Sequence, residues 1–279
     1  MHVYISIDME GVAGVASVDQ VARGGYGYPR AQALMTAEAN AAIAGAFEGG
    51  ATKVTVNDSH GTMDNLLHEQ LDERADLIFG SPKAQCMAHG MSAEHDLALF
   101  VGYHAAAGEA GVLSHTFSSF FSSFRLNGET VSEAEVNALY AATHGVPVGL
   151  VSGDDVICSV VGQRLSGVVT VPVKRAEGWT AATSMHPARA REAIKVGARD
   201  AVRATTRLAP VRVPDRLVLD VGMHVPTAVE VAALVPGAEQ TSAYGVRIEV
   251  ATPAELLGVI AVWYDLATSH MRGHMALRM

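Results

Sequence analysis

The feature that most constrains the fold is a regular alternation along the chain. Short apolar runs rich in β-branched residues alternate with alanine-rich stretches of helical character. This pattern is typical of a parallel sheet with helices packed on its faces. In the first half we expect strands at 3–7, 53–57, 77–79, 97–103 and 146–151, and helices at 30–48 and 132–144. The sequence therefore predicts an α/β fold with a largely parallel β-sheet flanked by helices.

Capping residues mark the ends of the predicted helices. The glycines at 49–50 and Gly145 stand where helix C-caps belong. Ser132 with Glu135 three residues later has the spacing of a capping box. We therefore expect a helix to begin just after Ser132.

The alternation continues in the second half of the chain. Before it, residues 112–126 are rich in Ser and Phe, which predicts extended segments leading into an Asn127-Gly128 hairpin turn. Beyond residue 160 we expect strands near 168–173, 217–221 and 246–250, helices at 187–205 and 253–271, and a mobile or interface-packed tail at 271–279. We predict a core lobe at 1–160 and a smaller C-terminal α/β lobe at 161–279, with a soft boundary that also allows one domain.

Composition excludes several classes of partner. The formal net charge is −9 and no basic cluster stands out, which argues against a nucleic-acid partner. No apolar run reaches the ~18 residues of a membrane span, and no basic leader precedes the first strand. Cys86 and Cys158 are far apart and form no ligand or disulfide pattern, so we expect a cytoplasmic protein. A hydrophobic fraction of 49% favours burial between subunits.

Polar residues capable of metal binding follow four of the predicted strands. Asp8 and Glu10 follow the first, the Asp-Ser-His segment 58–60 follows the second, His104 follows the strand at 97–103, and two aspartates at 154–155 follow the last. Ligands gather at the carboxyl ends of parallel strands because loops converge there. We therefore expect these side chains to meet at one edge of the sheet.

The pair Asp8 and Glu10 is the strongest element of this set. Alternation along an extended chain places both carboxylates on one side, where they can share one cation or bind two neighbouring ones. Gly11 lets the backbone turn away immediately afterwards. His60 and His104 add imidazole nitrogens, and mixed oxygen and nitrogen ligation suits zinc, with manganese, iron or cobalt as substitutes.

Other polar positions have structural interpretations of equal or greater weight. Asp58 fits a turn cap better than a partner that orients a histidine. The aspartates at 154–155 fit helix N-caps better than ligands. His115 fits a hydrogen-bonded core histidine and a site histidine equally well, and Glu133 is expected in a first helical turn from the helix dipole alone.

Motifs of other enzyme classes are absent. The sequence contains no GxxxxGK[ST], GxSxG or HExxH, so the usual support for an NTPase, a serine hydrolase or a helix-borne zinc protease is missing. The glycine-rich stretch 24–28 precedes a predicted helix and follows no strand. It fits a flexible loop near the site better than a dinucleotide fingerprint.

At these residues the chain resembles a known family, the bacterial D-aminopeptidases. These are binuclear zinc peptidases of dipeptide-transport operons, marked by an SxDxEG signature that reads Ser-Ile-Asp-Met-Glu-Gly at 6–11 here. Segments 56–60, 102–105, 114–115 and 131–133 also look like family blocks in family order, so the resemblance covers nearly the whole chain.

The resemblance implies the composition of the site. It implies two zinc ions per subunit, a catalytic histidine at His115, and a homodecamer that encloses its active sites. It also implies hydrolysis of N-terminal residues, D-amino acids such as D-alanine, from short peptides. The implied zinc ligands are Asp8, Glu10, His60, His104 and Glu133.

The mechanistic hypothesis is that Asp8 bridges the two ions, with His115 serving as base, proton donor or oxyanion stabiliser. Two alternatives are a binuclear-metal phosphoesterase and a non-catalytic protein that binds peptides. The absence of a basic residue beside the motifs counts against the first, and a histidine poised beside the metals counts against the second.

Overall fold

The larger of two sheets carries the strand ends singled out by the sequence. The computed structural model describes residues 1–276, with side chains through His270. Seven strands pair in the order β3-β2-β1-β4-β7-β8-β9, and all neighbours are parallel except β8 and β9. They are β1 (His2–Ile7), β2 (Lys53–Asp58), β3 (Ala75–Ile78), β4 (Leu97–Tyr103), β7 (Val148–Asp154), β8 (Val169–Gly178) and β9 (Ala181–Ser184). The predicted α/β class is confirmed.

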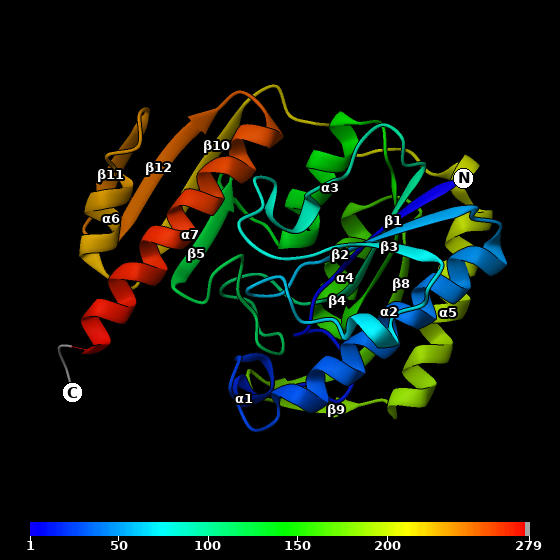
Figure 1. The fold of residues 1–279 in the computed structure, drawn as a ribbon. Helices are drawn as coiled ribbons and strands as arrows, with labels where there is room; N and C mark the ends of the chain where they lie inside the picture. Colours follow the sequence, from blue (N-terminus) through cyan, green and yellow to red (C-terminus); the bar gives the residue numbers. More distant parts are fainter. Residues whose placement is uncertain (277–279) are drawn as a thin grey trace.

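Helices cover both faces of this sheet (Figure 1). On one face α2 packs against α5, and on the other lie α3 and α4. The helices are α1 (Val18–Val21), α2 (Tyr28–Gly49), α3 (Glu133–Thr143), α4 (Asp155–Arg164), α5 (Pro187–Arg203), α6 (Pro226–Ala232) and α7 (Pro253–Ala276). Short 3₁₀ turns are η1 (His68–Gln70), η2 (Cys86–Ala88) and η3 (Thr205–Arg207).

The predicted caps account for where the helices begin and end. Ser132 and Glu135 form the capping box of α3, and the Asp154 side chain accepts the Ile157 N–H at the start of α4. Gly50 ends α2 with φ of 112°, a left-handed conformation that glycine adopts without steric cost. Asp154 is thus an N-cap, as the sequence predicted.

The second sheet is antiparallel and draws on both halves of the chain. Its order is β11-β12-β10-β5-β6, formed by β5 (Phe121–Leu126), β6 (Glu129–Thr130), β10 (Leu217–Met223), β11 (Ala238–Ser242) and β12 (Gly245–Val250). Asn127 and Gly128 make the predicted hairpin turn, with φ of 52° and 86°. Strands β8 and β9 follow residue 160 but belong to the larger sheet, and α5 packs against that sheet. The larger sheet therefore includes residues on both sides of position 160. A lobe boundary there stays a prediction.

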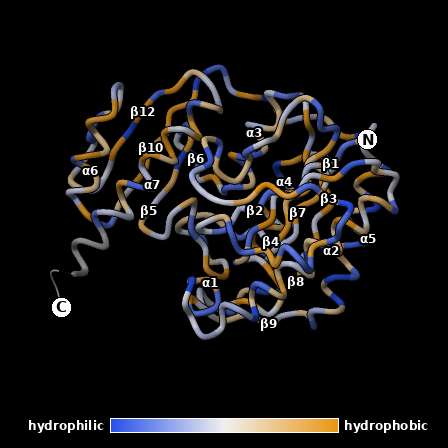
Figure 2. The backbone as a smooth tube through the Cα atoms, in the orientation of Figure 1, coloured by the Kyte–Doolittle hydropathy of each residue, from blue (hydrophilic) through white to orange (hydrophobic). Residues whose placement is uncertain are grey.

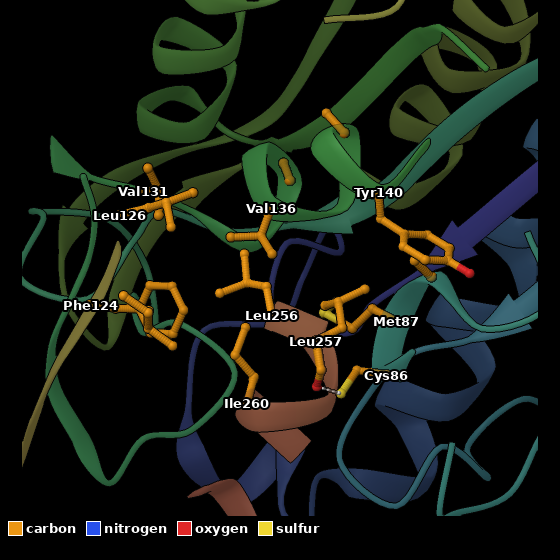
Figure 3. Close-up of a cluster of buried hydrophobic side chains, with 14 of the residues drawn as sticks. Cys86, Met87, Phe124, Leu126, Val131, Val136, Tyr140, Leu256, Leu257 and Ile260 are labelled. Atoms are coloured by element: carbon orange, nitrogen blue, oxygen red, sulfur yellow. Dashed lines mark hydrogen bonds between the residues drawn. The ribbon is translucent and has the colours of Figure 1, made fainter. Parts of the chain in front are cut away.

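Helix α7 joins the two sheets through the hydrophobic core. In Figure 3, Leu256 of α7 lies next to Val136 of α3, and Leu257 of α7 lies next to Met87 and Cys86 of η2; all of these residues are buried. Figure 2 shows hydrophobic positions concentrated where the strands of the larger sheet cross the interior. A second buried cluster lies between that sheet and the helices α2 and α5. The strand ends are therefore held between two packed layers.

The prediction of extended structure across 112–126 is wrong for residues 112–120. Only β5 is a strand, and the preceding segment is an irregular loop in which Leu113 and Phe117 have φ of 53° and 60°. Tertiary contacts override the local pattern, because the Leu113 N–H donates to the carbonyl of Trp179 at 2.8 Å. This loop carries His115.

The C-terminal helix extends further than expected. The predicted helix 253–271 continues as α7 through Ala276, and residues 277–279 of the predicted tail lie outside the described residues. Within residues 1–276, no helix is long and apolar enough to cross a bilayer.

Candidate metal centre

Five of the predicted ligands lie together at the carboxyl edge of the larger sheet. Asp8 and Glu10 follow β1, His60 follows β2, His104 follows β4, and Glu133 opens α3. All five are buried, with residue exposures between 1% and 8%. Five acidic or imidazole side chains buried in one place require either mutual charge compensation or a bound cation.

The carboxylate of Asp8 occupies the middle of this cluster. Its Oδ1 lies 3.3 Å from Nδ1 of His60, and its Oδ2 lies 3.3 Å from Nε2 of His104. Nδ1 of His60 also lies 2.9 Å from Oε2 of Glu10, and Nε2 of His104 also lies 3.3 Å from Oε2 of Glu133. Each oxygen of Asp8 therefore faces a different carboxylate and imidazole pair.

His115 lies at the outer side of the second pair. Its ring stacks on that of His104, with centroids 4.1 Å apart and an interplanar angle of 12°. Its Nε2 is 3.8 Å from Oε1 of Glu133, and its side chain is 18% exposed. His115 is thus the most exposed of the three histidines of the cluster.

Backbone carbonyls orient all three imidazoles in the same way. The second nitrogen of each ring lies beside a carbonyl: His60 Nε2 is 2.8 Å from Val21 O, His104 Nδ1 is 2.9 Å from Ala105 O, and His115 Nδ1 is 2.8 Å from Leu113 O. A carbonyl only accepts, so these nitrogens are the N–H donors of the neutral rings. The opposite nitrogens then face the carboxylates, where they can bind a metal ion when neutral or donate to the carboxylates when protonated.

The buried polar atoms of the cluster fit a metal ion. Asp8 Oδ2, Glu10 Oε2 and His104 Nε2 make no hydrogen bond of acceptable geometry. Asp8 Oδ2 and His104 Nε2 nevertheless lie 3.3 Å apart, and Glu10 Oε2 lies 2.9 Å from Nδ1 of His60. Two sets of ligand atoms converge within 4.8 Å: Asp8, Glu10 and His104, and His104, His115 and Glu133. Oxygen and imidazole donors in this arrangement suit zinc.

The electrostatics of the metal-free cluster show the compensation that a cation would replace. Burial opposes ionisation of Asp8, yet the imidazoles of His104 and His60 lower its pKa to about 2. Burial also disfavours charged imidazoles, but Glu10 and Asp8 raise the pKa of His60, and Glu133 and Asp8 raise that of His104, well above the usual value. The raised pKa values favour the protonated, positively charged imidazoles of His60 and His104, and a bound cation would replace that positive charge.

A polar network beneath the carboxylates fixes the three central strands. The hydroxyl of Ser6 lies 2.7 Å from that of Ser59 and 2.7 Å from that of Tyr103, and it donates to the Met87 carbonyl at 2.9 Å. Asn137 of α3 donates to the Tyr103 hydroxyl at 3.0 Å. The segments that carry Asp8, His60, His104 and Glu133 are therefore linked below the site.

Asp58 orders the loop that carries His60. Its carboxylate accepts the backbone N–H groups of Asn65 and Leu66 at 2.6 and 2.8 Å, together with the Asn65 side chain at 2.7 Å. The Lys83 ammonium donates to the carbonyl of Asp58 at 2.7 Å and so stabilises the same loop. The role of Asp58 is thus structural, as the sequence favoured, whereas Lys83 carried no signal in the sequence.

A cavity of about 470 Å³ opens onto the cluster. Asp8, Glu10, His60, His115 and Glu133 form its polar end, and its remaining wall is mainly apolar. The apolar wall includes Val18, Val21, Met63, Leu113, Phe117, Trp179, Ile260 and Tyr264. A volume of this size accommodates a small ligand. Val18, Val21 and Ala22 line the cavity, whereas no residue of the glycine-rich stretch 24–28 does.

Fold and site together define the class of α/β metallohydrolases, in which carboxylates and imidazoles at the carboxyl edge of a parallel sheet hold catalytic metal ions.

Comparison with known proteins identifies the particular group. A family model described as D-aminopeptidase matches residues 1–262, and the chain belongs to this family. A D-aminopeptidase from Bacillus subtilis (strain 168) is 35% identical over 268 residues, which cover 96% of this chain and 98% of the relative. The solved structure of the Zn-dependent D-aminopeptidase DppA from Bacillus subtilis, described as a self-compartmentalizing protease, superposes with a TM-score of 0.92. That match has 34% identity and covers 96% of this chain and 98% of the other. The resemblance inferred from the motifs is confirmed.

Proposed function

We propose that this protein is a zinc-dependent D-aminopeptidase that removes N-terminal D-residues from short peptides at a binuclear centre. The observation that carries the proposal is the position of Asp8, whose two oxygens face two different imidazoles at 3.3 Å each. A carboxylate so placed can bridge two ions. Family membership and the name of the solved relative support zinc and the D-aminopeptidase activity.

The geometry supports a specific division of ligands. Glu10, His60 and Oδ1 of Asp8 would hold one ion, and His104, Glu133 and Oδ2 of Asp8 would hold the other. Two bound zinc ions would supply an activated water and polarise the scissile carbonyl.

His115 is the proposed catalytic residue. Its Nδ1 donates to the carbonyl of Leu113, which leaves Nε2 as the atom that can accept a proton. That nitrogen faces the cavity end of the cluster beside Glu133. We propose that Nε2 takes a proton from the attacking water and delivers it to the leaving amine.

The cavity supports a small peptide as substrate. Its volume of about 470 Å³ and mainly apolar wall suit a peptide of few residues with small side chains. The preference for D-residues rests on the activity named for the relatives.

We also propose that the protein assembles into a homo-oligomer, as a decamer, in the cytoplasm. The description of the solved relative as a self-compartmentalizing protease supports assembly. Exposed apolar side chains such as Leu234 at 78% and Tyr244 at 55% offer surface for subunit contacts. Both cysteines are free and buried, which suits a reducing compartment.

The decisive experiment measures release of free D-alanine from D-alanyl-D-alanine by purified protein. We expect release that is lost on treatment with a chelator and restored by zinc, and little release from L-alanyl-L-alanine. Release from the L-peptide alone would overturn the D-specificity. Cleavage of a chromogenic phosphate without peptide hydrolysis would favour the phosphoesterase alternative, and peptide binding without turnover would favour a binding protein.

A further inference from the structure

A buried lysine far from the predicted motifs contacts the segment that follows β1. Lys174 lies on β8 with an exposure of 3%. Its ammonium donates to three backbone carbonyls, those of Glu10, Val12 at 3.1 Å and Val15 at 2.6 Å. All three acceptors belong to one short segment, and the first is the main chain of a proposed zinc ligand.

A buried glutamate holds the same segment from another element. Glu38 lies on α2 with an exposure of 2%, and its Oε1 accepts the Ala13 N–H at 2.9 Å. Its Oε2 has no hydrogen-bond partner among the described residues. Lys174 and Glu38 meet at the peptide group between Val12 and Ala13, whose carbonyl accepts from Lys174 and whose N–H donates to Glu38.

The bonding of Lys174 indicates a role in geometry. The ammonium is almost fully buried, so its charge is unfavourable unless its protons are well bonded. Among the side chains described, none forms a salt bridge with Lys174, and all of its hydrogen bonds go to carbonyls of this one segment. The carboxylates of Glu38, Asp154, Glu10 and Asp8 are close enough to favour the ammonium electrostatically, but its protons bind only backbone oxygens. Its hydrogen bonds therefore fix the path of this backbone segment.

We propose that Lys174 is a positioning residue that holds the Glu10 carboxylate opposite His60. The inference rests on the proposed zinc site. Without the ammonium, the carbonyls of Glu10 and Val15 lose their donor, whereas that of Val12 keeps the Val15 N–H. The segment then has to rearrange so that the two carbonyls reach other partners or water. Glu10 moves with it. The ligands on the other side, His104 and Glu133, are carried by different elements and keep their positions.

The consequence is selective weakening of one of two metal sites. Removal of a group that orients a metal ligand typically lowers metal affinity by about 10–100-fold. For the variant Lys174→Met we expect one zinc dissociation constant to rise by about that factor and the other to change by less than about 3-fold. A merely structural lysine would lower the melting temperature without separating the two constants.

The experiment titrates zinc into metal-free protein against a competing chromogenic chelator, for wild type, Lys174→Met and Lys53→Met. Lys53 is an exposed lysine of β2 paired with Asp76, so its replacement controls for the loss of one positive charge. We expect two tight sites in wild type and in Lys53→Met. In Lys174→Met we expect one tight and one weakened site.

A double-mutant comparison assigns the weakened site. In a Glu10→Ala background, Lys174→Met should cause no further loss of zinc affinity, because its effect acts through Glu10. The milder variant Lys174→Gln has a shorter side chain that still carries two N–H donors. It replaces Lys174→Met in the titration if that variant does not fold. Equal affinities in Lys174→Met and wild type, equal weakening of both sites, or full additivity with Glu10→Ala would overturn the inference. Failure of the proposed function would show differently, as wild-type protein that binds fewer than two zinc ions.

Discussion

Replacement of Gly11 by alanine is the sharpest test of how closely the fold holds the metal centre. A Cβ atom built on Gly11 would lie 2.0 Å from the carbonyl oxygen of Tyr103 and 2.4 Å from the carbonyl carbon of Gly102. Ordinary contact begins near 3.4 Å, so β1 and β4 must separate locally by about 1.4 Å. The Gly11 N–H, which donates to the Gly102 carbonyl at 2.7 Å, would lose that bond.

The separation would move ligands of both proposed ions. Glu10 directly precedes Gly11, and His104 directly follows Tyr103. A misplacement of about 1 Å can lower catalysis about 100-fold, so we expect kcat/KM of Gly11→Ala to fall by at least about 100-fold. Overpacking of this kind costs about 1–3 kcal/mol of stability. Zinc affinity should fall at both sites, in contrast to Lys174→Met.

The assay compares Gly11→Ala with Gly162→Ala by zinc content, kcat/KM on D-alanyl-D-alanine, and thermal unfolding. Gly162 lies inside α4, where an added Cβ would meet Thr170 at 3.6 Å, an ordinary contact. This control should keep full activity and gain up to about 1 kcal/mol of stability, because alanine favours the helix interior. Full zinc content and unchanged kcat/KM in Gly11→Ala would refute the reasoning.

Four further predictions concern residues of the site. Asp8→Ala should bind fewer than two zinc ions and lose activity, since its two oxygens serve both proposed ions; two ions retained at wild-type affinity would contradict the bridge. His115→Gln should keep both ions while kcat falls by about 10²–10⁴-fold, and loss of an ion would make His115 a ligand. Because the pKa values of His60 and His104 are raised well above 6.5 in the metal-free protein, zinc binding at pH 7 should release protons. Calorimetry in two buffers of different ionisation enthalpy measures that release, and equal heats would contradict it. The same raised pKa values stabilise the metal-free protein below pH 6.5, and this stability should be lost as pH rises through the folded-state values.

Local patterns predicted most strands of the larger sheet and the edge of that sheet where the proposed ligands lie. Strands, caps and the edge of the sheet follow from short-range rules, because alternation and capping are properties of neighbouring residues. The proposed ligands Asp8, Glu10, His60 and His104 could be singled out since each lies within three residues of the end of a strand. Glu133 could not, because a first-turn acid is common in any helix.

The supporting residues escaped prediction for a physical reason. Lys174 and Glu38 have no local pattern, and they matter only because β8 and α2 both reach the segment after β1. That meeting is set by the tertiary path of the chain. The loop at 112–120 was mispredicted for a similar reason, since its left-handed residues Leu113 and Phe117 are held by contacts with distant segments.

The alternation of the SxDxEG signature runs from the end of β1 into the bend at Met9 and Glu10. Ile7 and Met9 point into the hydrophobic layer beneath α2 and are fully buried, whereas the alternate residues Ser6, Asp8 and Glu10 face the polar side. Ser6 ties the strands together beneath the site, Asp8 lies between the two histidines, and Glu10 stands opposite one of them. The spacing of two therefore has a structural cause. A shift of one residue in the pairing of β1 would send both carboxylates into the apolar layer and bring Ile7 and Met9 to the metal site, so the register of β1 is fixed by core and centre together.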